Sequence, residues 1–409
     1  MSEWKKVKFL NLFSEPTKNG IYKSKEFHGR GAKIINMGEV FAYSFIGNQE
    51  MSRVEINDKE RNSFIVKNGD LLFARRSLVE SGAGKCAIAN GITEETTFES
   101  SIIRVRLNEN YAIPLFYMYW MRSLSGRTAI NGIVNGVNVK GIRATDLQNI
   151  EVDLPPLHTQ HRIATILFRY DSLIENYQKQ IKLLEEAAQR LYKEWFVDLH
   201  FPGHENTKIV DGVPEGWEKK KLVEFAEIVM GQSPKSEYYN NEFKGLPFHQ
   251  GVGSYGNRYV VDNTYSTSFT RIAEPNSVLF SVRAPVGRLN ITKNKVVIGR
   301  GLAAMTHKKG YQSYLFYLLK ERFFKDNIIG NGAIFASISK NELHNLDFTT
   351  PTDDLVIRFN TIAGNLDDEI MKVDSQIRLL TEARDRLLPK LINGVIIKNI
   401  NKKIICVTL

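Results

Sequence analysis

The chain has 409 residues, of which 43% are hydrophobic and 24% are charged, and this composition excludes a disordered chain and favours two or three packed domains. Lysine and arginine number 55 against 45 aspartate and glutamate residues, a net charge of +10 that favours an anionic partner such as nucleic acid. The two cysteines, Cys86 and Cys406, have no metal-ligand spacing, and apolar runs such as residues 113–121 are too short to span a bilayer, so the sequence predicts a cytoplasmic protein without a structural zinc, a disulfide framework or a membrane segment.

Residues 1–155 contain short apolar runs separated by glycine, asparagine and proline. The runs at residues 63–66, 70–73 and 102–106 are typical of β-strands. A longer apolar stretch at residues 113–125 predicts a helix. The pattern indicates an α+β domain in which a helix packs on a mixed sheet.

Residues 156–200 are predicted to form a long helix that begins after Pro155 and Pro156, where the fixed backbone angle of proline suits a first helical turn. Apolar side chains recur at alternating spacings of four and three, which is the pattern of a coiled-coil seam. A helix of about 35 to 40 residues extends roughly 50 to 60 Å, so it must project from the domain or span between domains. The predicted seam residues are Ile163, Leu167, Tyr170, Ile174, Tyr177, Ile181, Leu184, Ala188, Leu191 and Trp195.

A linker at residues 201–216, with two prolines and three glycines, separates this half from a second globular segment at residues 217–350. The second segment again carries strand-like runs, at residues 277–280 and 296–298, and a predicted helix at residues 312–325. A second α+β domain is therefore expected.

A second long helix is predicted at residues 351–395, and the tail at residues 396–409 carries no recognisable pattern. Arg384 interrupts the apolar seam of this helix at the place that Ala188 holds in the first helix. The arginine either fixes the register of the helices or extends its charged end into solvent. The other seam residues are Phe359, Ala363, Leu366, Ile370, Val373, Ile377, Leu380, Leu387 and Leu391.

The two halves of the chain repeat one another. The stretch Gln180–Ala187 returns as Gln376–Ala383 at a shift of 196 positions. Matches continue upstream in the same order, and Leu115–Tyr117 returns as Leu315–Tyr317 at a shift of 200. Chance similarity between two amphipathic helices would not extend through the preceding strands, so the sequence predicts an internal duplication of a domain followed by a helix.

The positive charge lies in the globular segments. Residues 1–155 hold 21 basic and 17 acidic side chains and residues 212–350 hold 18 and 12, whereas residues 156–211 hold 7 and 8 and residues 351–409 hold 9 and 8. The nearly neutral helices suit packing against protein, and the basic domains are the expected nucleic-acid-binding parts.

Motifs for catalysis are weak in this chain. Gly251–Gly256 has the letters of a dinucleotide-binding fingerprint, but it lacks the flanking strand and helix and is better interpreted as a turn that lets the backbone approach a partner. Asp211, Glu218 and Lys220 have the residue types of a magnesium-dependent nuclease, but the first copy offers only Trp4-Lys5-Lys6 at the equivalent place. No catalytic residue and no metal site are therefore predicted.

Basic and amide side chains in loops beside predicted strand ends are the residue types that contact bases and phosphates. Arginine can donate two hydrogen bonds to guanine, whereas a single lysine usually contacts phosphate. Arg75 and Arg76 follow one predicted strand, and Arg283 follows the matching strand of the second copy. The predicted DNA-binding candidates are Arg75, Arg76, Lys85, Asn135, Asn138, Lys140, Gln250, Tyr255, Arg258, Arg283, Arg288, Arg300, Asn331 and Phe335.

Four stretches together are similar to a known family. They are Leu154–Leu157 with Gln160, Ile163, Ala164 and Leu167; Val213–Trp217; residues 278–291 around Val282–Gly287; and Gly299–Ala303. Through them the whole chain resembles the specificity (S) subunit of type I restriction-modification systems. Thr350-Pro351-Thr352 replaces Leu154-Pro155-Pro156 in the second copy, which is a departure from the pattern at the start of the second helix.

The resemblance implies two target-recognition domains separated by two long helices that pair as an antiparallel coiled coil, with a pseudo-twofold internal repeat. Each domain would bind one half of a split, asymmetric site in double-stranded DNA, and the helices would separate the half-sites by about 34 Å. It also implies that this chain has no catalysis and no cofactor of its own. Two methyltransferase subunits, which bind S-adenosylmethionine, and two restriction subunits, which use ATP and magnesium, would dock on the complex and supply the chemistry.

Two other classes of function remain open from the residues alone. A magnesium-dependent DNA endonuclease would require Asp211, Glu218 and Lys220 to lie close together. A protein scaffold built on the paired helices would bind its partners but would show no salt-sensitive affinity for DNA.

Overall fold

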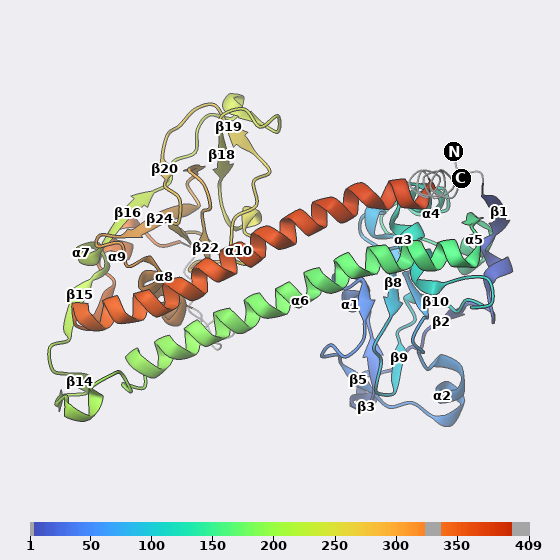
Figure 1. Ribbon diagram of the computed structural model, residues 1–409, viewed down its shortest axis with the longest axis horizontal. Helices are drawn as coiled ribbons and strands as arrows, with labels where there is room; N and C mark the ends of the chain where they lie inside the picture. The colour runs from blue at the N-terminus through green and yellow to red at the C-terminus, as the bar shows by residue number, and fades with distance from the viewer. Residues whose placement is uncertain (1–3, 324–336, 395–409) are drawn as a thin grey trace, which may run out of the picture. The chain divides into compact units, whose positions relative to one another are not determined.

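The computed structural model describes residues 4–323 and 337–394. The chain forms two compact units, one made of residues 1–176 and 377–409 and the other of residues 177–376. Each long helix is divided between the units: α6 spans Leu157–Phe196 and α10 spans Asp353–Ile392. Figure 1 shows α6 in green and α10 in red. Both helices lie within the ranges predicted from the apolar spacing.

Unit 1 is an α+β domain built on a five-stranded sheet and a three-stranded sheet. The five-stranded order is β2 (Lys18–Asn19), β10 (Ile102–Val105), β6 (Leu71–Ala74), β8 (Cys86–Ala89) and β4 (Phe45–Ile46). The three-stranded order is β5 (Arg53–Val54), β3 (His28–Ile35) and β9 (Thr96–Phe98), and the two remaining pairs are β1 (Lys5–Lys8) with β12 (Glu151–Leu154) and β7 (Arg76–Ser77) with β11 (Lys140–Gly141). The shorter helices are α1 (Met37–Ala42), α2 (Asp58–Phe64), α3 (Pro114–Arg122), α4 (Leu124–Asn131) and α5 (Ala144–Asn149).

Unit 2 is a second α+β domain with a four-stranded and a five-stranded sheet. The four-stranded order is β16 (Ala226–Met230), β24 (Leu302–His307), β21 (Val278–Ser281) and β22 (Leu289–Ile291). The five-stranded order is β17 (Tyr239–Asn240), β19 (Tyr265–Ser266), β18 (Leu246–His249), β23 (Val296–Ile298) and β20 (Ile272–Ala273). The remaining pairs are β13 (Ile209–Val210) with β14 (Val213–Pro214) and β15 (Glu218–Lys221) with β25 (Asp347–Thr350), and the shorter helices are α7 (Leu222–Phe225), α8 (Gln312–Phe323) and α9 (Lys340–His344).

The strand order of the two units confirms the internal repeat. In unit 1, β6 lies between β10 and β8, antiparallel to both, and in unit 2, β21 lies between β24 and β22 in the same way. Each unit also has a parallel pair at the matching place, β3 with β9 and β18 with β23. An antiparallel pair at the matching place, β1 with β12 and β15 with β25, includes the strand that precedes the long helix. The halves of the chain therefore fold to the same core topology.

The two long helices lie side by side within each unit. In unit 1, Ile163 and Leu167 share a buried cluster with Leu391 and Ile392, and in unit 2 the Trp195 ring lies 6.1 Å from that of Phe359. In unit 1, residues near the start of α6 contact residues near the end of α10. In unit 2, a residue near the end of α6 contacts one near the start of α10. The helix segments are therefore antiparallel in each unit. All of the predicted seam positions are buried or half-buried.

Arg384 binds the facing helix of unit 1 and does not extend into solvent. Its Nη1 lies 2.5 Å from Asp171 Oδ1 on α6, and Tyr119 of α3 donates its hydroxyl hydrogen to the other carboxylate oxygen at 2.6 Å. Asp171 is buried. Of the two interpretations of Arg384, the structure supports pairing between the helices.

Two predictions of local structure were wrong, and a third segment contains strands that the sequence did not predict. The expected strand at residues 63–66 overlaps the end of α2, which is set by a capping box in which the Asn57 side chain accepts from Glu60 N and the Glu60 carboxylate accepts from Asn57 N, both at 2.9 Å. The helix at residues 113–125 is broken at Ser123, which ends α3 and caps α4. The linker at residues 201–216 contains the β13–β14 hairpin.

In the described part of the chain, no helix combines the length and the apolar content of a membrane-spanning segment.

His307 makes the stability of unit 2 sensitive to acid. Its side chain is 6% exposed, and its Nδ1 accepts a hydrogen bond from Lys309 N at 3.1 Å, which requires an unprotonated Nδ1. Burial, assisted by Lys309, lowers the pKa of His307 to about 4. The unfolded chain binds a proton near pH 6.5 and the folded chain only near 4, so we expect unit 2 to lose up to roughly 3 kcal/mol as the pH falls through this interval.

Urea unfolding at pH 7.5 and pH 5 would measure this loss. We expect the His307→Gln variant to lose less stability between these pH values than the wild type, and the His28→Gln variant, at an exposed position, to behave as the wild type. Equal losses in the wild type and His307→Gln would contradict the assignment.

Candidate nucleic-acid interface

Three predicted DNA-binding residues of unit 2, Gln250, Arg283 and Arg300, lie on adjoining segments at one end of its sheets. Gly301 N donates to Gln250 O at 3.1 Å, and Val282 N donates to Gly301 O at 2.9 Å. All three side chains are exposed. No ion pair joins Arg283 or Arg300 to another residue of the described part of the chain. We call this group of Gln250, Arg283 and Arg300 the rim of unit 2.

Glycines allow these segments to approach one another. A Cβ atom at Gly301 would lie 2.4 Å from Gln250 O, and one at Gly299 would lie 2.9 Å from Ser233 Oγ. Arg300 stands between these two glycines, and its backbone N donates to Ser233 Oγ at 3.2 Å. The backbone around Arg300 is thus fixed while its side chain is exposed, as a residue that contacts a partner requires.

A hollow of about 490 Å³ opens beside Gln250. Tyr239 and Phe248 line it with stacked rings whose centroids are 4.6 Å apart, and Asn263 and Thr264 add polar groups. An amide, a hydroxyl and aromatic faces are groups that bind nucleic-acid bases by hydrogen bonding and stacking.

Unit 1 gathers Arg75, Arg76, Asn135 and Lys140 in the corresponding place. Arg75 N donates to Ser101 O at 2.8 Å, and Arg76 and Lys140 belong to the paired strands β7 and β11. Asn135 exchanges two backbone hydrogen bonds with Gly141, at 2.9 and 2.8 Å. Asn138 lies in the exposed turn between Asn135 and Lys140. We call this group, with Asn138, the rim of unit 1.

Backbone contacts align the two rims residue by residue. In unit 1, Arg76 pairs with Gly141, and in unit 2, Arg283 pairs with Ser337. Ser337 corresponds to Gly141 because the two positions differ by the shift of 196 that relates the copies. Glu99 N donates to Ile35 O at 3.0 Å in unit 1, as Gly299 N donates to His249 O at 2.8 Å in unit 2. An arginine therefore stands at one matched place in both units.

The next matched place differs between the units. Because Glu99 aligns with Gly299, Ser100 of unit 1 stands where unit 2 has Arg300. Glu99 also accepts a hydrogen bond from Met37 N at 2.6 Å through its side chain, so a carboxylate occupies the unit 1 rim where unit 2 has no side chain. The two rims share a scaffold but present different chemical groups.

Four predicted candidates are poorly placed for DNA. Lys85 donates through Nζ to Phe41 O at 2.6 Å, and burial lowers its pKa. The Tyr255 hydroxyl is buried, which raises its pKa. Arg288 is half-buried, and Arg258 is 4% exposed. We withdraw Lys85 and Arg258 from the candidates because both side chains are bound within the protein. Asn331 and Phe335 lie outside the described residues.

Arg258 joins the domain of unit 2 to both long helices. Its Nη1 donates to Glu185 Oε1 of α6 at 3.1 Å, and its Nη2 donates to Asp367 of α10. The Tyr317 hydroxyl donates to the same Asp367 oxygen at 2.8 Å. Burial lowers the pKa of Arg258, but the nearby carboxylates raise it more strongly, so the guanidinium stays charged. We call Arg258, Glu185, Asp367 and Tyr317 the buried clamp.

Sequence reasoning missed Asp367 and its counterpart Asp171. Asp171 and Asp367 stand 196 positions apart on the two helices, and each accepts a tyrosine hydroxyl and an arginine. A carboxylate repeated at the same point of two apolar seams was a signal that these positions are buried and paired.

The residues considered for a nuclease do not form a metal site. Lys220 binds Glu218 at 2.8 Å, and Asp211 lies in the turn between β13 and β14. Across residues 4–323 and 337–394, no group of three or more histidine, cysteine, aspartate and glutamate side chains could hold a metal ion. The structure gives the nuclease alternative no support.

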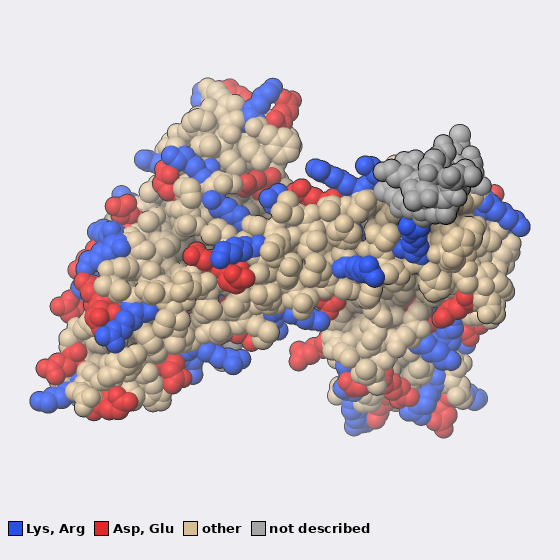
Figure 2. Space-filling model, in the orientation of Figure 1, with Lys and Arg blue, Asp and Glu red and all other residues tan. Residues whose placement is uncertain are grey.

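Charge alone does not mark the interface. On the face shown in Figure 2, basic and acidic side chains are interspersed over both units. The rims are distinguished instead by exposed arginine and amide groups, with the half-buried Arg75 and Lys140, on backbone that is fixed by neighbouring segments.

A family model described as the type I restriction modification DNA specificity domain matches residues 1–186 and 214–355. A putative type I restriction enzyme MjaX specificity subunit of Methanocaldococcus jannaschii is 32% identical over 85% of this chain and 83% of the relative. The MjaIX specificity subunit of the same organism is 27% identical over 91% of this chain and 88% of the relative.

The fold is similar to that of a solved protein. The crystal structure of a type I restriction-modification system S subunit from M. genitalium matches with a TM-score of 0.60 and 16% identity, and the match covers 95% of this chain and 96% of that one. Two matches to the family model, a relative that is 32% identical and the repeated α+β fold all indicate the same family. The chain belongs to the family of type I restriction-modification DNA specificity proteins.

Proposed function

We propose that the chain is the specificity subunit of a type I restriction-modification complex and that each unit binds one half of a split site in double-stranded DNA. The observation that carries this proposal is the alignment of the rims. One arginine is shared, as Arg76 and Arg283, whereas Arg300 and Ser100 differ at the next matched place. A shared basic residue suits phosphate, which is common to all sequences, and a variable residue suits base recognition.

The paired helices would fix the gap between the half-sites and present a surface to other subunits. Two methyltransferase subunits carrying S-adenosylmethionine and two restriction subunits using ATP and magnesium would supply catalysis. This chain itself would be non-catalytic and would bind no cofactor. A scaffold without DNA affinity is the weaker proposal, because it leaves the exposed arginines of the rims without a role.

Exchange of one domain tests the proposal. We expect a chimera in which a relative's domain replaces residues 212–350 to methylate a site that is changed in one half only, because the unit 1 rim remains intact. Methylome sequencing of cells that express the chimera with its methyltransferase partner would read both halves at once.

The reciprocal exchange of residues 1–155 provides the control and should change the opposite half. A chimera that alters both halves would contradict the assignment of one half-site to each domain. Binding that is unaffected by salt would instead favour the scaffold, since phosphate contacts release counterions.

A further inference from the structure

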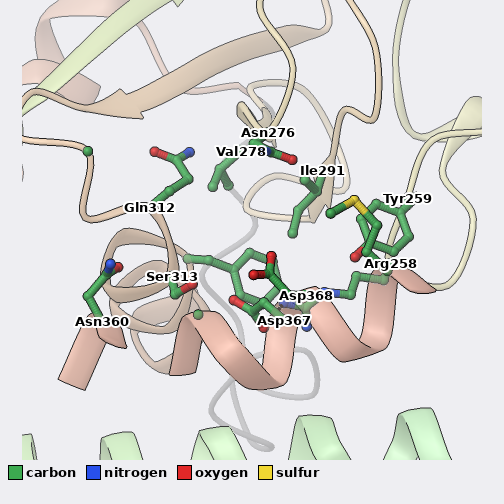
Figure 3. A pocket seen from close by; sticks show the side chains of 14 residues that line it. Arg258, Tyr259, Asn276, Val278, Ile291, Gln312, Ser313, Asn360, Asp367 and Asp368 are labelled. Carbon is green, nitrogen blue, oxygen red and sulfur yellow. Dashed lines mark hydrogen bonds and ion pairs between the residues drawn. The ribbon is translucent and has the colours of Figure 1, made fainter. Parts of the chain in front are cut away.

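Unit 2 contains a cavity of about 190 Å³ between α10 and the domain. Arg258, Tyr259, Ser313, Gly364, Asp367 and Asp368 are among the residues that line it. In Figure 3, Asp367 and Asp368 come from α10, and Tyr259 and Arg258 lie at one end of the cavity. The cavity lies beside the buried clamp and away from the rim.

The first copy has a phenylalanine where the second has Gly364. Phe168 of α6 aligns with Gly364 of α10 at the shift of 196 positions that relates the helices. The ring of Phe168 packs edge-on against Phe45, with centroids 5.4 Å apart. A Cβ atom at Gly364 would have only Ser313 Oγ within 4 Å, at 3.8 Å. The second copy therefore lacks a ring at this place and leaves space there.

Tyr259 corresponds to Phe45, the partner of the missing ring. Phe45 pairs in parallel with Ile88, and Tyr259 pairs in parallel with Ile291. Ile88 and Ile291 are themselves matched, because they face Leu71 of β6 and Val278 of β21 in the two central strand pairs. The aromatic surface that holds the Phe168 ring in unit 1 is thus present in unit 2 and borders the cavity.

The cavity has the size for one small ring and the polarity for a substituted one. An apolar cavity of about 150 Å³ admits benzene, and this one is somewhat larger. Asp367 and Asp368 offer carboxylate oxygens that accept hydrogen bonds. Arg258 is 4% exposed, and its Nε has no hydrogen-bond partner among the described residues, so it offers one buried donor.

We propose that this cavity binds a small molecule with an amino-substituted nitrogen heterocycle, of which adenine is the simplest probe. The ring would occupy the place of the missing phenylalanine beside Tyr259, its amino group would donate to the carboxylates of α10, and a ring nitrogen would accept from Arg258 Nε. Hypoxanthine has an oxygen in place of the amino group, so it would present an acceptor to the carboxylates and should bind poorly.

Calorimetric titration of the full chain with adenine and with hypoxanthine tests the proposal. We expect one adenine to bind per chain, at least ten-fold more tightly than hypoxanthine. Gly364→Phe, which restores the residue of the first copy, should weaken adenine binding at least ten-fold without altering a polar group. Gly364→Ala fills little of the space and is the matched control; it should retain binding and raise the melting temperature, because alanine is the better helix former.

Ser313→Ile provides a second filling variant if Gly364→Phe fails to fold, since Ile113 stands at the matching place in unit 1. Absence of saturable adenine binding, equal binding of hypoxanthine, or adenine binding that both filling variants leave unchanged would overturn the proposal and leave a cavity that holds water alone. None of these outcomes bears on DNA recognition by the rims, because the cavity contains no rim residue.

Discussion

Replacement of Arg258 by methionine should lower the free energy of unfolding of unit 2 by about 3 to 5 kcal/mol, the usual cost of removing one partner from a buried ion pair. The change leaves Asp367 and Glu185 without their guanidinium, and Asp367 is largely buried. Peptide-resolved hydrogen exchange would measure the effect separately in the two units. We expect faster exchange in β21 and β24 and little change in unit 1.

Two controls separate the clamp from a general effect of charge. Lys182→Met removes an exposed ion pair with Glu186 on the same helix and should cost less than about 0.5 kcal/mol. Arg258→Met combined with Asp367→Leu and Glu185→Leu removes all three charges and should recover most of the stability, because a buried ion-pair cluster can be replaced by well-packed apolar groups at little cost. If β21 and β24 of the Arg258→Met variant exchanged hydrogen at the wild-type rate, the buried clamp would not be what holds the domain on the helices.

The stability lost in the Arg258→Met variant should depend on pH in a defined direction. Burial raises the pKa of Asp367 above its ordinary value. A carboxyl group whose pKa is raised by folding binds more protons when folded, so its stabilising contribution is present at low pH and is lost as the pH rises through the raised pKa. Arg258→Met should therefore lie closer to the wild type in stability at pH 5 than at pH 8.

Replacement of Arg300 by alanine should weaken binding to the cognate DNA by about 1 to 3 kcal/mol and relax the preference at one base pair, because the proposed function assigns base recognition to Arg300. Arg283→Ala should weaken binding to all sequences alike and reduce the dependence of affinity on salt by about one phosphate contact. Both effects follow from the exposed positions of these side chains on the rim of unit 2.

Fluorescence anisotropy in a potassium chloride series would separate the two roles, with the chain bound to its methyltransferase partner and a duplex identified by methylome sequencing. Arg190→Ala is the matched control, because Arg190 is an exposed arginine on α6 that pairs only weakly with Glu186, at 3.5 Å. Loss of sequence preference in Arg283→Ala, with none in Arg300→Ala, would reverse the assignment.

Periodic features of the fold were predictable from the sequence. The long helices follow from apolar residues at regular spacing, and the duplication follows from one constant shift along them. Even so, the apolar run at residues 63–66 suggested a strand, because the pattern of apolar residues does not reveal that Asn57 and Glu60 satisfy the backbone at the start of a helix. A local hydrogen-bond network decided between two structures that the residue pattern allowed.

Contacts between distant segments were beyond sequence reasoning. Gln250 and Arg300 are adjacent only because β18 and β23 pair in parallel. Arg258 looked like a loop arginine available to DNA, since its acidic partners stand 73 and 109 positions away on two helices. Charged residue type predicts solvent exposure in general, and only the packing shows where a charge is buried with its partner.

The division of the long helices between the units also constrains how the chain can fold during synthesis. Unit 2 is continuous, from residue 177 to residue 376, whereas unit 1 needs the segment that starts at residue 377. Leu391 and Ile392 belong to the core of unit 1, so apolar surface of the first domain stays uncovered until residue 392 has left the ribosome. Of the two units, the one whose synthesis begins first is therefore completed second, which reverses the usual order for multidomain proteins.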